Sequence, residues 1–255
     1  MSHATAEPHG HDHAEHTELG GFVRHGATKW WHYFTFNTDH KVIGIQYFVS
    51  SFIFFILGGT LALLIRTELL TPELDLGGLA TSIGIEYTAN TYNTMFTLHG
   101  TIMIFMWVIP LLVGAFGNYL VPIMIGADDM AFPKLNALSF WLFWPGSLVL
   151  IASFFVPGAP QAGWTSYPPL STSPISQIGQ TLWIVSLLIV GTSSLVGAIN
   201  YLVTIATMRA PGMGIWQMPL FVWSVAATAF MITLSTPMLT GALVMLLMDL
   251  NFGAN

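Results

Sequence analysis

Five apolar stretches, each long enough to cross a lipid bilayer, dominate this sequence. A transmembrane helix needs about 20 predominantly apolar residues, and hydrocarbon offers the backbone no hydrogen-bond partner, so such stretches fold as helices. The stretches lie at about residues 42–65, 94–126, 137–157, 179–208 and 218–248. Pro110 and Pro237 fall inside two of them, where we expect each proline to kink its helix. The sequence therefore predicts an all-α integral membrane protein with five transmembrane helices.

The composition agrees with this class. Charged residues make up 7% of the 255 residues and hydrophobic residues 54%, whereas a soluble domain has about 25% charged residues. We expect membrane lipid around the chain and no nucleic-acid partner. Cysteine is absent, which excludes disulfides and thiolate metal sites. Redox chemistry in this chain would need a bound cofactor.

The basic residues predict the orientation in the membrane. Most of them lie before the first stretch, between the second and third, or between the fourth and fifth: Arg24, Lys29, Lys41, Lys134 and Arg209. These segments share one side of the membrane, and Lys and Arg near the ends of spans favour the cytoplasmic side. We therefore expect a cytoplasmic N-terminus, with the first helix running outward.

Residues 1–29 differ from the rest of the chain. They are rich in histidine and contain too little apolar surface to fold alone. We expect a disordered, His-rich cytoplasmic tail, followed by one membrane domain over residues 30–255. Histidine-rich tracts can bind metal, but a solvated tail is the simpler interpretation.

The one histidine outside the first 40 residues, His99, lies in the apolar second stretch. An ionisable residue in the membrane indicates a functional site by default, and a neutral imidazole is a common ligand of haem iron. Arg66 ends the first stretch at a similar predicted depth, where a guanidinium could pair with polar groups of a haem. Met95, Met103 and Met106 share roughly the same helical face. The alternative is a histidine hydrogen-bonded between helices, with the methionines as ordinary packing.

A second group of polar residues lies at the inner ends of the second to fourth stretches. Its members are Asn118, Asp128, Asp129, Asn136, Ser193, Ser194 and Asn200. An acid at an aqueous mouth, followed by amides and hydroxyls, can order a file of water along which protons move. The alternative is helix capping by Asp and Asn together with packing of small serines between helices.

Several long strings, in order, resemble subunit I of the haem–copper oxidases, of the cytochrome c oxidase type. They are FNTDHK at 36–41, GNYLVP at 117–122, GADDMAFP at 126–133, GWTSYPP at 163–169, GAIN at 197–200 and PLFVWSV at 219–225. The resemblance extends from about residue 30 to the last residue.

This resemblance implies roles for individual residues. His99 matches an axial ligand of the low-spin haem, and Arg66 matches an arginine that contacts substituents of that haem. Trp164 and Tyr167 match an outer loop near the haem propionates. The proton-uptake entrance is matched by Asp129, Asn118 and Asn136, and positions further along the same channel by Asn200 and Ser193.

The resemblance also implies what this chain lacks. Subunit I of that family has twelve helices, and this chain would supply the first five, ending before the copper ligands, the high-spin haem ligand and the second low-spin haem ligand. We expect a low-spin haem, of type a, with the high-spin haem and copper B held outside this chain. We also expect this chain alone to be inactive.

The implied partners are the remaining helices of subunit I, subunits II and III, cytochrome c or quinol as the electron donor, and O2. The implied location is the plasma (inner) membrane, crossed several times. The alternative function is a non-catalytic split subunit, or a haem-binding helix bundle that acts as an assembly partner.

Overall fold

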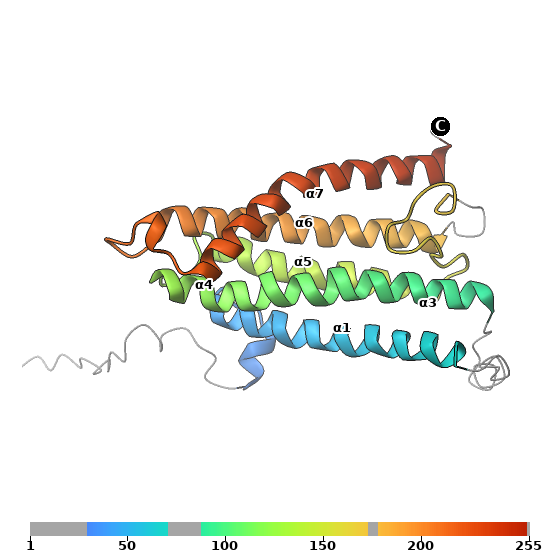
Figure 1. Cartoon of the computed structure of the whole chain (residues 1–255), viewed down its shortest axis with the longest axis horizontal. Helices are drawn as coiled ribbons and strands as arrows, with labels where there is room; N and C mark the ends of the chain where they lie inside the picture. Colours follow the sequence, from blue (N-terminus) through green and yellow to red (C-terminus); the bar gives the residue numbers. More distant parts are fainter. Residues whose placement is uncertain (1–29, 71–87, 173–177, 254–255) are drawn as a thin grey trace, which may run out of the picture.

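The computed structural model describes residues 30–70, 88–172 and 178–253. The predictions made for the tail, residues 1–29, lie outside the described residues. The described part is helical, and Figure 1 shows its long helices running side by side as one bundle.

Five helical spans are each long and apolar enough to cross a membrane, as predicted. They are α1 (His40–Glu68), a second span from Ala89 to Ile125, α5 (Pro133–Ala152), α6 (Ile178–Thr207) and α7 (Leu220–Phe252). Short 3-10 helices, η1 (Trp30–Phe34) and η5 (Ile215–Gln217), precede the first and last spans. The prediction of five transmembrane helices is confirmed.

Local sequence signals account for several helix ends. The Asp39 carboxylate accepts the backbone N–H groups of Lys41 at 2.7 Å and Val42 at 3.3 Å, which caps the start of α1. The second span begins at Ala89, about five residues before the predicted start, because a capping box at Thr88 extends the helix beyond its apolar part. Gly126 ends this span with a φ of 73°, a conformation that favours glycine.

The second span changes its winding along its length. It consists of α3 (Ala89–Thr101), the π-helical segments η2 (Ile102–Val108) and η3 (Pro110–Gly117), and α4 (Asn118–Ile125). Pro110 has no N–H to donate, and a wider winding is one way for a helix to absorb this defect. The kink at Pro110 stays a prediction, and the structure shows a π-helical winding at this position. Pro237 lies inside α7, whose ribbon bends along its length (Figure 1).

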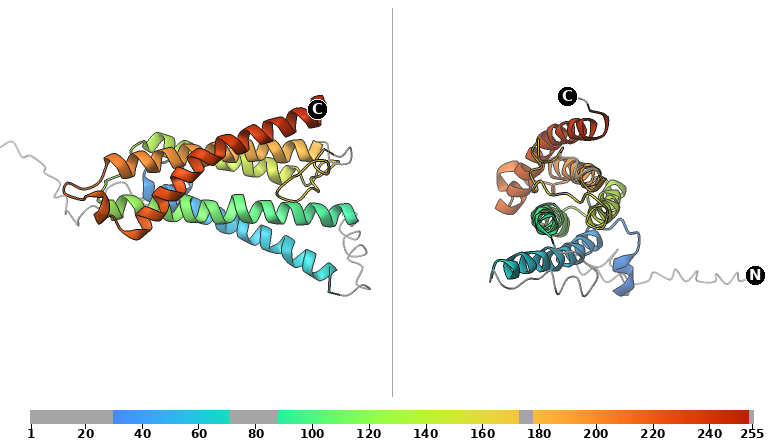
Figure 2. Two further views of the ribbon diagram at one scale, coloured as in Figure 1. Left: turned by 45° about the horizontal axis from the view of Figure 1, so that its top comes forward. Right: turned by 90° about the vertical axis from the view of Figure 1, so that its right-hand side faces the viewer.

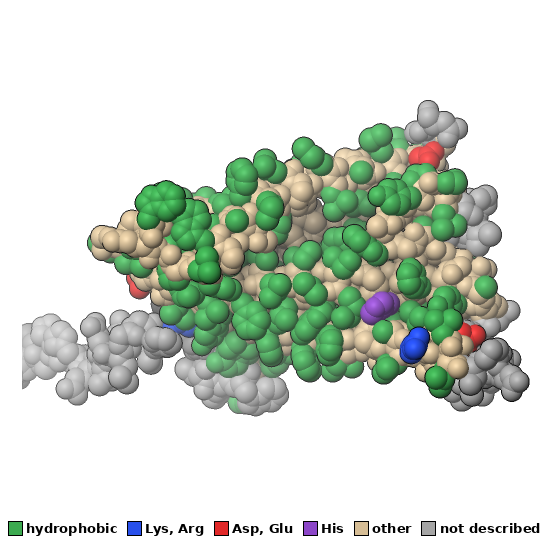
Figure 3. All heavy atoms as spheres, viewed as in Figure 1, with side chains coloured by type: hydrophobic (Ala, Val, Ile, Leu, Met, Phe, Trp, Pro, Cys, Tyr) green, Lys and Arg blue, Asp and Glu red, His purple; other side chains and the backbone are tan. Residues whose placement is uncertain are grey.

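Two hydrophobic clusters hold the bundle together. The larger one joins α1, the second span, α5 and α6, and includes the buried rings of Phe54, Phe143 and Trp183. The other joins α4, α6 and the first half of α7 around Tyr201 and Val222. Figure 2 shows α7 crossing one flank of the bundle. Hydrophobic side chains cover most of the face seen in Figure 3, as a lipid-facing surface requires.

Glycines permit close contacts between segments, and Gly179 at the start of α6 is the tightest case. A Cβ there would lie 2.5 Å from the carbonyl oxygen of Gly158 and closer still to Cα of Ala159, which are backbone atoms that cannot rotate away. By contrast, a Cβ at Gly59 of α1 would meet open space.

We therefore expect Gly179→Ala to destabilise the protein by about 1–3 kcal/mol through overpacking. Gly59→Ala should be neutral or stabilising by up to about 1 kcal/mol, because alanine favours the helix. Thermal unfolding in detergent, followed by circular dichroism, measures both. Equal melting temperatures for the two variants would contradict this packing account.

Candidate functional site

His99 lies near the end of α3, directly before the π-helical segment, and is half-buried. Its Nδ1 lies 2.9 Å from the carbonyl oxygen of Gly58 on α1. A carbonyl can only accept, so Nδ1 carries the proton and Nε2 keeps a free lone pair. This is the tautomer in which a histidine binds a metal through Nε2. Figure 3 shows a histidine side chain at the surface, with a basic side chain on the same face.

Two glycines let other groups approach His99 closely. A Cβ at Gly58 would lie 2.8 Å from Sδ of Met103, so the Met103 side chain packs closely against α1 at this glycine. A Cβ at Gly100 would lie 3.2 Å from Cδ1 of Trp164, so the indole lies directly against the turn that carries His99. The structure thus places Trp164 against Gly100, the residue that follows His99.

A hydrogen bond anchors the Trp164 loop to α3. The backbone N–H of Gly163 donates to Oγ1 of Thr97 at 3.0 Å. The indole of Trp164 is 44% exposed, which leaves one side open to a neighbour. Tyr167 of the same loop is 74% exposed, so its side chain is not packed against the bundle as Trp164 is.

Arg66 is exposed and lies closer to the end of α1 than the histidine contact. It follows Gly58 by eight residues, which corresponds to about 12 Å along the helix. The prediction of a similar depth for Arg66 and His99 is therefore only approximate. A guanidinium at this separation could reach the rim of a large planar ligand on His99, but not the ligating nitrogen.

The predicted methionine face is wrong for Met106. Met106 is fully buried, and its sulfur accepts a hydrogen bond from Oγ of Ser147 on α5 at 3.0 Å. The π-helical winding after Thr101 changes which residues share a face, so regular α-helical spacing fails here. Met103 alone of the three contacts the position of Gly58 beside His99.

These residues fit a haem on the chemistry of their side chains. His99 offers one neutral imidazole nitrogen, Trp164 an aromatic surface, and Arg66 a cation for carboxylate or carbonyl groups. Among residues 30–70, 88–172 and 178–253, no three His, Cys, Asp or Glu side chains gather as a metal site.

A second polar site surrounds Asp129, in the turn between α4 and α5. Burial raises the pKa of the Asp129 carboxyl above its ordinary value. The backbone N–H of Met130, which donates to Oδ1 at 2.7 Å, lowers this pKa, as does the charge of His40, whereas the charge of Asp39 raises it. Burial is therefore the main cause of the raised pKa of Asp129, and the charges at the start of α1 modify it.

Behind this acid, two buried amides have unsatisfied groups. Within the described residues, Oδ1 of Asn118 and Nδ2 of Asn136 have no hydrogen-bond partner. His40 binds the same region, because its Nδ1 lies 2.7 Å from the carbonyl oxygen of Asn118. Buried polar groups are rarely left unpaired, and ordered water is the usual partner where the protein provides none.

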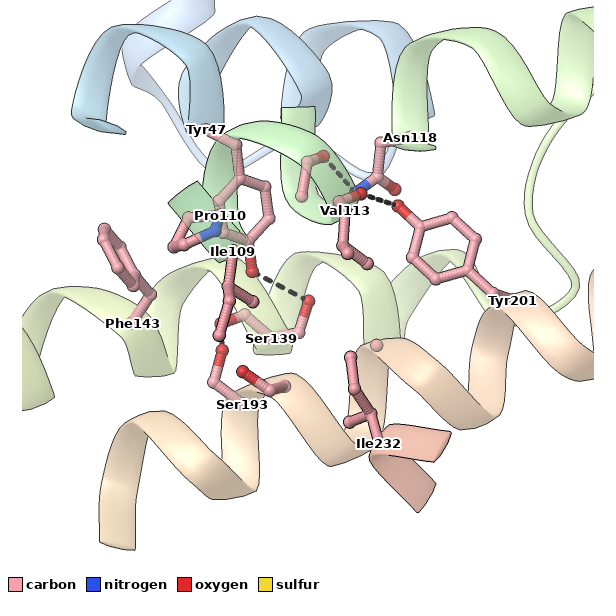
Figure 4. Close-up of a pocket in the computed structure, with 13 residues that line it drawn as sticks. Tyr47, Ile109, Pro110, Val113, Asn118, Ser139, Phe143, Ser193, Tyr201 and Ile232 are labelled. Atoms are coloured by element: carbon pink, nitrogen blue, oxygen red, sulfur yellow. Dashed lines mark hydrogen bonds between the residues drawn. The ribbon is translucent and has the colours of Figure 1, made fainter. Parts of the chain in front are cut away.

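A cavity of about 30 Å³ lies beside Asn118, between α1, the second span, α5 and α6 (Figure 4). It is lined by Tyr47, Ile109, Pro110, Val113, Gly114, Asn118, Ser139, Phe143, Ser193, Ser194, Gly197, Tyr201 and Ile232. One water needs about 10–15 Å³ of such volume, so the cavity has room for about two. Its hydroxyl and amide groups make it suitable for water.

Hydroxyl groups form much of the cavity wall. The hydroxyl of Tyr47 donates to Oγ of Ser139 at 3.2 Å, and Oγ of Ser193 donates to the carbonyl oxygen of Ser139 at 2.5 Å. The hydroxyl of Tyr201 donates to the carbonyl oxygen of Val113 at 2.6 Å. Sequence reasoning missed Tyr47, Ser139 and Tyr201; a tyrosine within an apolar stretch was the available signal.

Asn200 does not line this cavity. Its side chain pairs with the backbone of Phe132, accepting from the N–H at 2.9 Å and donating to the carbonyl oxygen at 3.2 Å. Asn200 therefore holds the turn that carries Asp129. Of the predicted inner group, Asn118, Ser193 and Ser194 line the cavity.

One half of the five-span bundle holds a histidine with a free ring nitrogen, and the other half holds a cavity lined partly by polar groups. These features define a class of multi-pass membrane protein with polar sites inside the bundle. The chain belongs to the family described as Cytochrome C and Quinol oxidase polypeptide I, which it matches over residues 42–255. It corresponds to the N-terminal part of that family's polypeptide.

Named relatives agree with this assignment. The chain is 53% identical over 229 residues to cytochrome c oxidase subunit 1 of Thermostichus vulcanus, covering 90% of this chain and 39% of the relative. It is 54% identical over 233 residues to the protein of the same name from Synechocystis sp., covering 91% of this chain and 40% of the relative. A putative cytochrome c oxidase subunit 1-beta of Streptomyces coelicolor is 43% identical over 220 residues, covering 86% of this chain and 36% of the relative.

Asp39 offers a direct test of the charges around Asp129. Asp39→Asn keeps a good helix cap but removes a negative charge that raises the pKa of Asp129, so this pKa should fall. Infrared titration of the protonated carboxyl band, assigned with Asp129→Asn, measures it. Asp128→Asn, at an exposed position, serves as the control. An unchanged or higher pKa in Asp39→Asn would refute the electrostatic coupling.

Proposed function

We propose that this chain forms the N-terminal part of the catalytic subunit of a respiratory terminal oxidase, which reduces O2 to water and takes up and pumps protons. Membership of the family supports the respiratory oxidase role. The single observation that carries the finer proposal is the His99–Gly58 hydrogen bond, because it leaves Nε2 of His99 free as a ligand.

On the proposed outer side, His99 binds the iron of a low-spin haem, of type a. Such a haem supplies a one-electron redox centre when bound. The Gly58 carbonyl fixes the tautomer and orientation of the imidazole. Trp164 covers the turn beside His99, and Tyr167 extends the same loop into its surroundings. Arg66 supplies a positive charge near the rim of the macrocycle.

On the proposed cytoplasmic side, protons enter at Asp129. Its raised pKa lets the carboxyl hold a proton at a higher pH than an exposed aspartate would. From there, Asn118 and Asn136 offer unpaired polar atoms to water, and the cavity continues along Ser193. Asn200 takes part in this entrance by fixing the Asp129 turn.

The complete enzyme needs groups from outside this chain. We propose that the remaining helices of subunit I hold the high-spin haem, copper B and the second low-spin haem ligand. Subunits II and III, and cytochrome c or quinol as the donor, complete the assembly. The complex lies in the plasma membrane, with the N-terminus of this chain in the cytoplasm, as the positive charges favour.

His99→Ala in the complete complex tests the haem assignment. Loss of the axial ligand should abolish the low-spin haem absorption band and electron entry. Arg66→Met should keep the haem but shift its band or potential, because Arg66 acts on the substituents and not on the iron. Visible spectroscopy and redox titration read both. An unchanged spectrum in His99→Ala would favour the non-catalytic assembly partner.

Asp129→Asn tests the proton entrance. The amide keeps the size of the side chain but cannot carry a proton, so turnover should fall at least about tenfold, given that positioned proton carriers typically contribute about 10² or more. Haem content should not change. Asp128→Asn, on the exposed neighbouring side chain, should retain near-normal turnover. Oxygen consumption and proton uptake in vesicles provide the measurement; normal uptake in Asp129→Asn would leave only a structural role.

A further inference from the structure

The turn that carries Asp129 is attached to α6 through two consecutive backbone amides. The N–H of Ala131 donates to Oγ1 of Thr204 at 2.9 Å, and the N–H of Phe132 donates to Oδ1 of Asn200 at 2.9 Å. Thr204 and Asn200 are both fully buried and lie one helical turn apart. Together they form a clamp on the turn, which we call the Thr204–Asn200 clamp.

The hydrogen bonds of Thr204 point to a structural role in the turn. Its hydroxyl donates to the carbonyl oxygen of Asn200 at 2.6 Å while it accepts from Ala131. Its only proton therefore points at a backbone carbonyl, which has no proton to pass on. One acceptor lone pair of the hydroxyl is taken by the Ala131 amide, so this bond fixes the position of the turn.

The other end of the turn is held from the same direction. The N–H of Ala210, just after α6, donates to the carbonyl oxygen of Ile125 at 2.8 Å. A Cβ at Gly126 would lie 2.9 Å from Cβ of Ala210, so the two backbones are in close contact. The turn from Gly126 to Phe132 is therefore fixed at both ends by α6 and the residues that follow it.

We propose that Thr204 is a positioning residue for proton uptake: through Ala131, it holds the Asp129 turn against α6 and so keeps the carboxyl partly buried beside the start of α1. This proposal rests on the proposed entry of protons at Asp129. It assigns Thr204 and Asn200 a mechanical role. Asn200 was predicted to lie along the file of water, whereas the proposal makes it a support for the turn.

The charges around Asp129 come from several elements. Asp39 and His40, at the start of α1, act on it directly. Asp128 of the same turn and Lys134 at the start of α5 are exposed. The guanidinium of Arg209, beyond α6, donates to the carbonyl oxygens of Ile205 and Met213. A turn that moves away from α6 therefore changes the burial of Asp129, which is the main cause of its raised pKa, and its distance from α1.

The test uses the complete oxidase complex containing this chain, with Thr204→Val as the main variant. Valine keeps the shape of threonine but leaves the Ala131 amide unpaired. We expect several-fold slower proton uptake, unchanged electron entry into the low-spin haem, and a downward shift of the infrared titration midpoint of Asp129. Thr204→Ser retains the hydroxyl and should behave as the wild type. Thr207→Val is the matched control, because Thr207 makes the same type of bond within α6, to the carbonyl oxygen of Val203, and is exposed.

The proposal is overturned if Thr204→Val and Thr207→Val have the same rate of proton uptake and the same titration midpoint of Asp129. It is also overturned if Thr204→Ser loses as much proton uptake as Thr204→Val. If Thr204→Val does not assemble, amide hydrogen exchange of residues 126–132 in Thr204→Ala decides: faster exchange supports the clamp, and unchanged exchange refutes it. Normal proton uptake in Asp129→Asn would refute only the proposed proton entrance. The titration midpoint of Asp129 and the amide hydrogen exchange of the turn test the Thr204–Asn200 clamp independently of proton uptake.

Discussion

Hydrocarbon provides no hydrogen-bond partner, so the polar groups inside this bundle depend on neighbouring segments of the same chain. Many serine and threonine hydroxyls donate to the carbonyl oxygen four residues earlier, as Ser51 does to Tyr47. Others cross between helices: Trp183 donates to Thr101, and Ser186 donates to the carbonyl oxygen of Gly146. These crossing bonds fix which helix faces meet, and the functional side chains take their positions from them.

The departures from this pattern are informative for the same reason. The imidazole of His99 satisfies one nitrogen on α1 and keeps the other available. The amides of Asn118, which lines a small cavity, and of Asn136 each keep a buried atom unpaired. Buried polar atoms without a partner are costly unless a ligand or water completes them. Within the described residues, Gln46, Glu68, Trp141, Ser171 and Gln180 also have such atoms, so it is the neighbouring cavity that distinguishes Asn118.

Hydropathy was enough to predict the five spans, because lipid imposes a length and a composition on each of them. The positions of polar residues at the inner ends also predicted a second site. The sequence could not predict the direction in which side chains point. Asn200 turns toward the backbone of Phe132. Tyr47 and Ser139 reach the cavity from helices whose crossing is set by packing. Regular α-helical spacing failed for Met106 because the winding changes after Thr101.

The π-helical stretch from Ile102 to Gly117 separates His99 from Asn118 on one continuous span. Each residue of an α-helix advances the direction of its side chain by about 100°. The wider winding therefore sets the angular phase between the two ends of the span, and through it the relative directions in which the histidine and the amide point. Deleting a residue of this stretch that lines neither site, such as Leu112, would rotate one half against the other while preserving every side chain at both sites. The length of this stretch is thus as much a part of the two sites as the residues that form them.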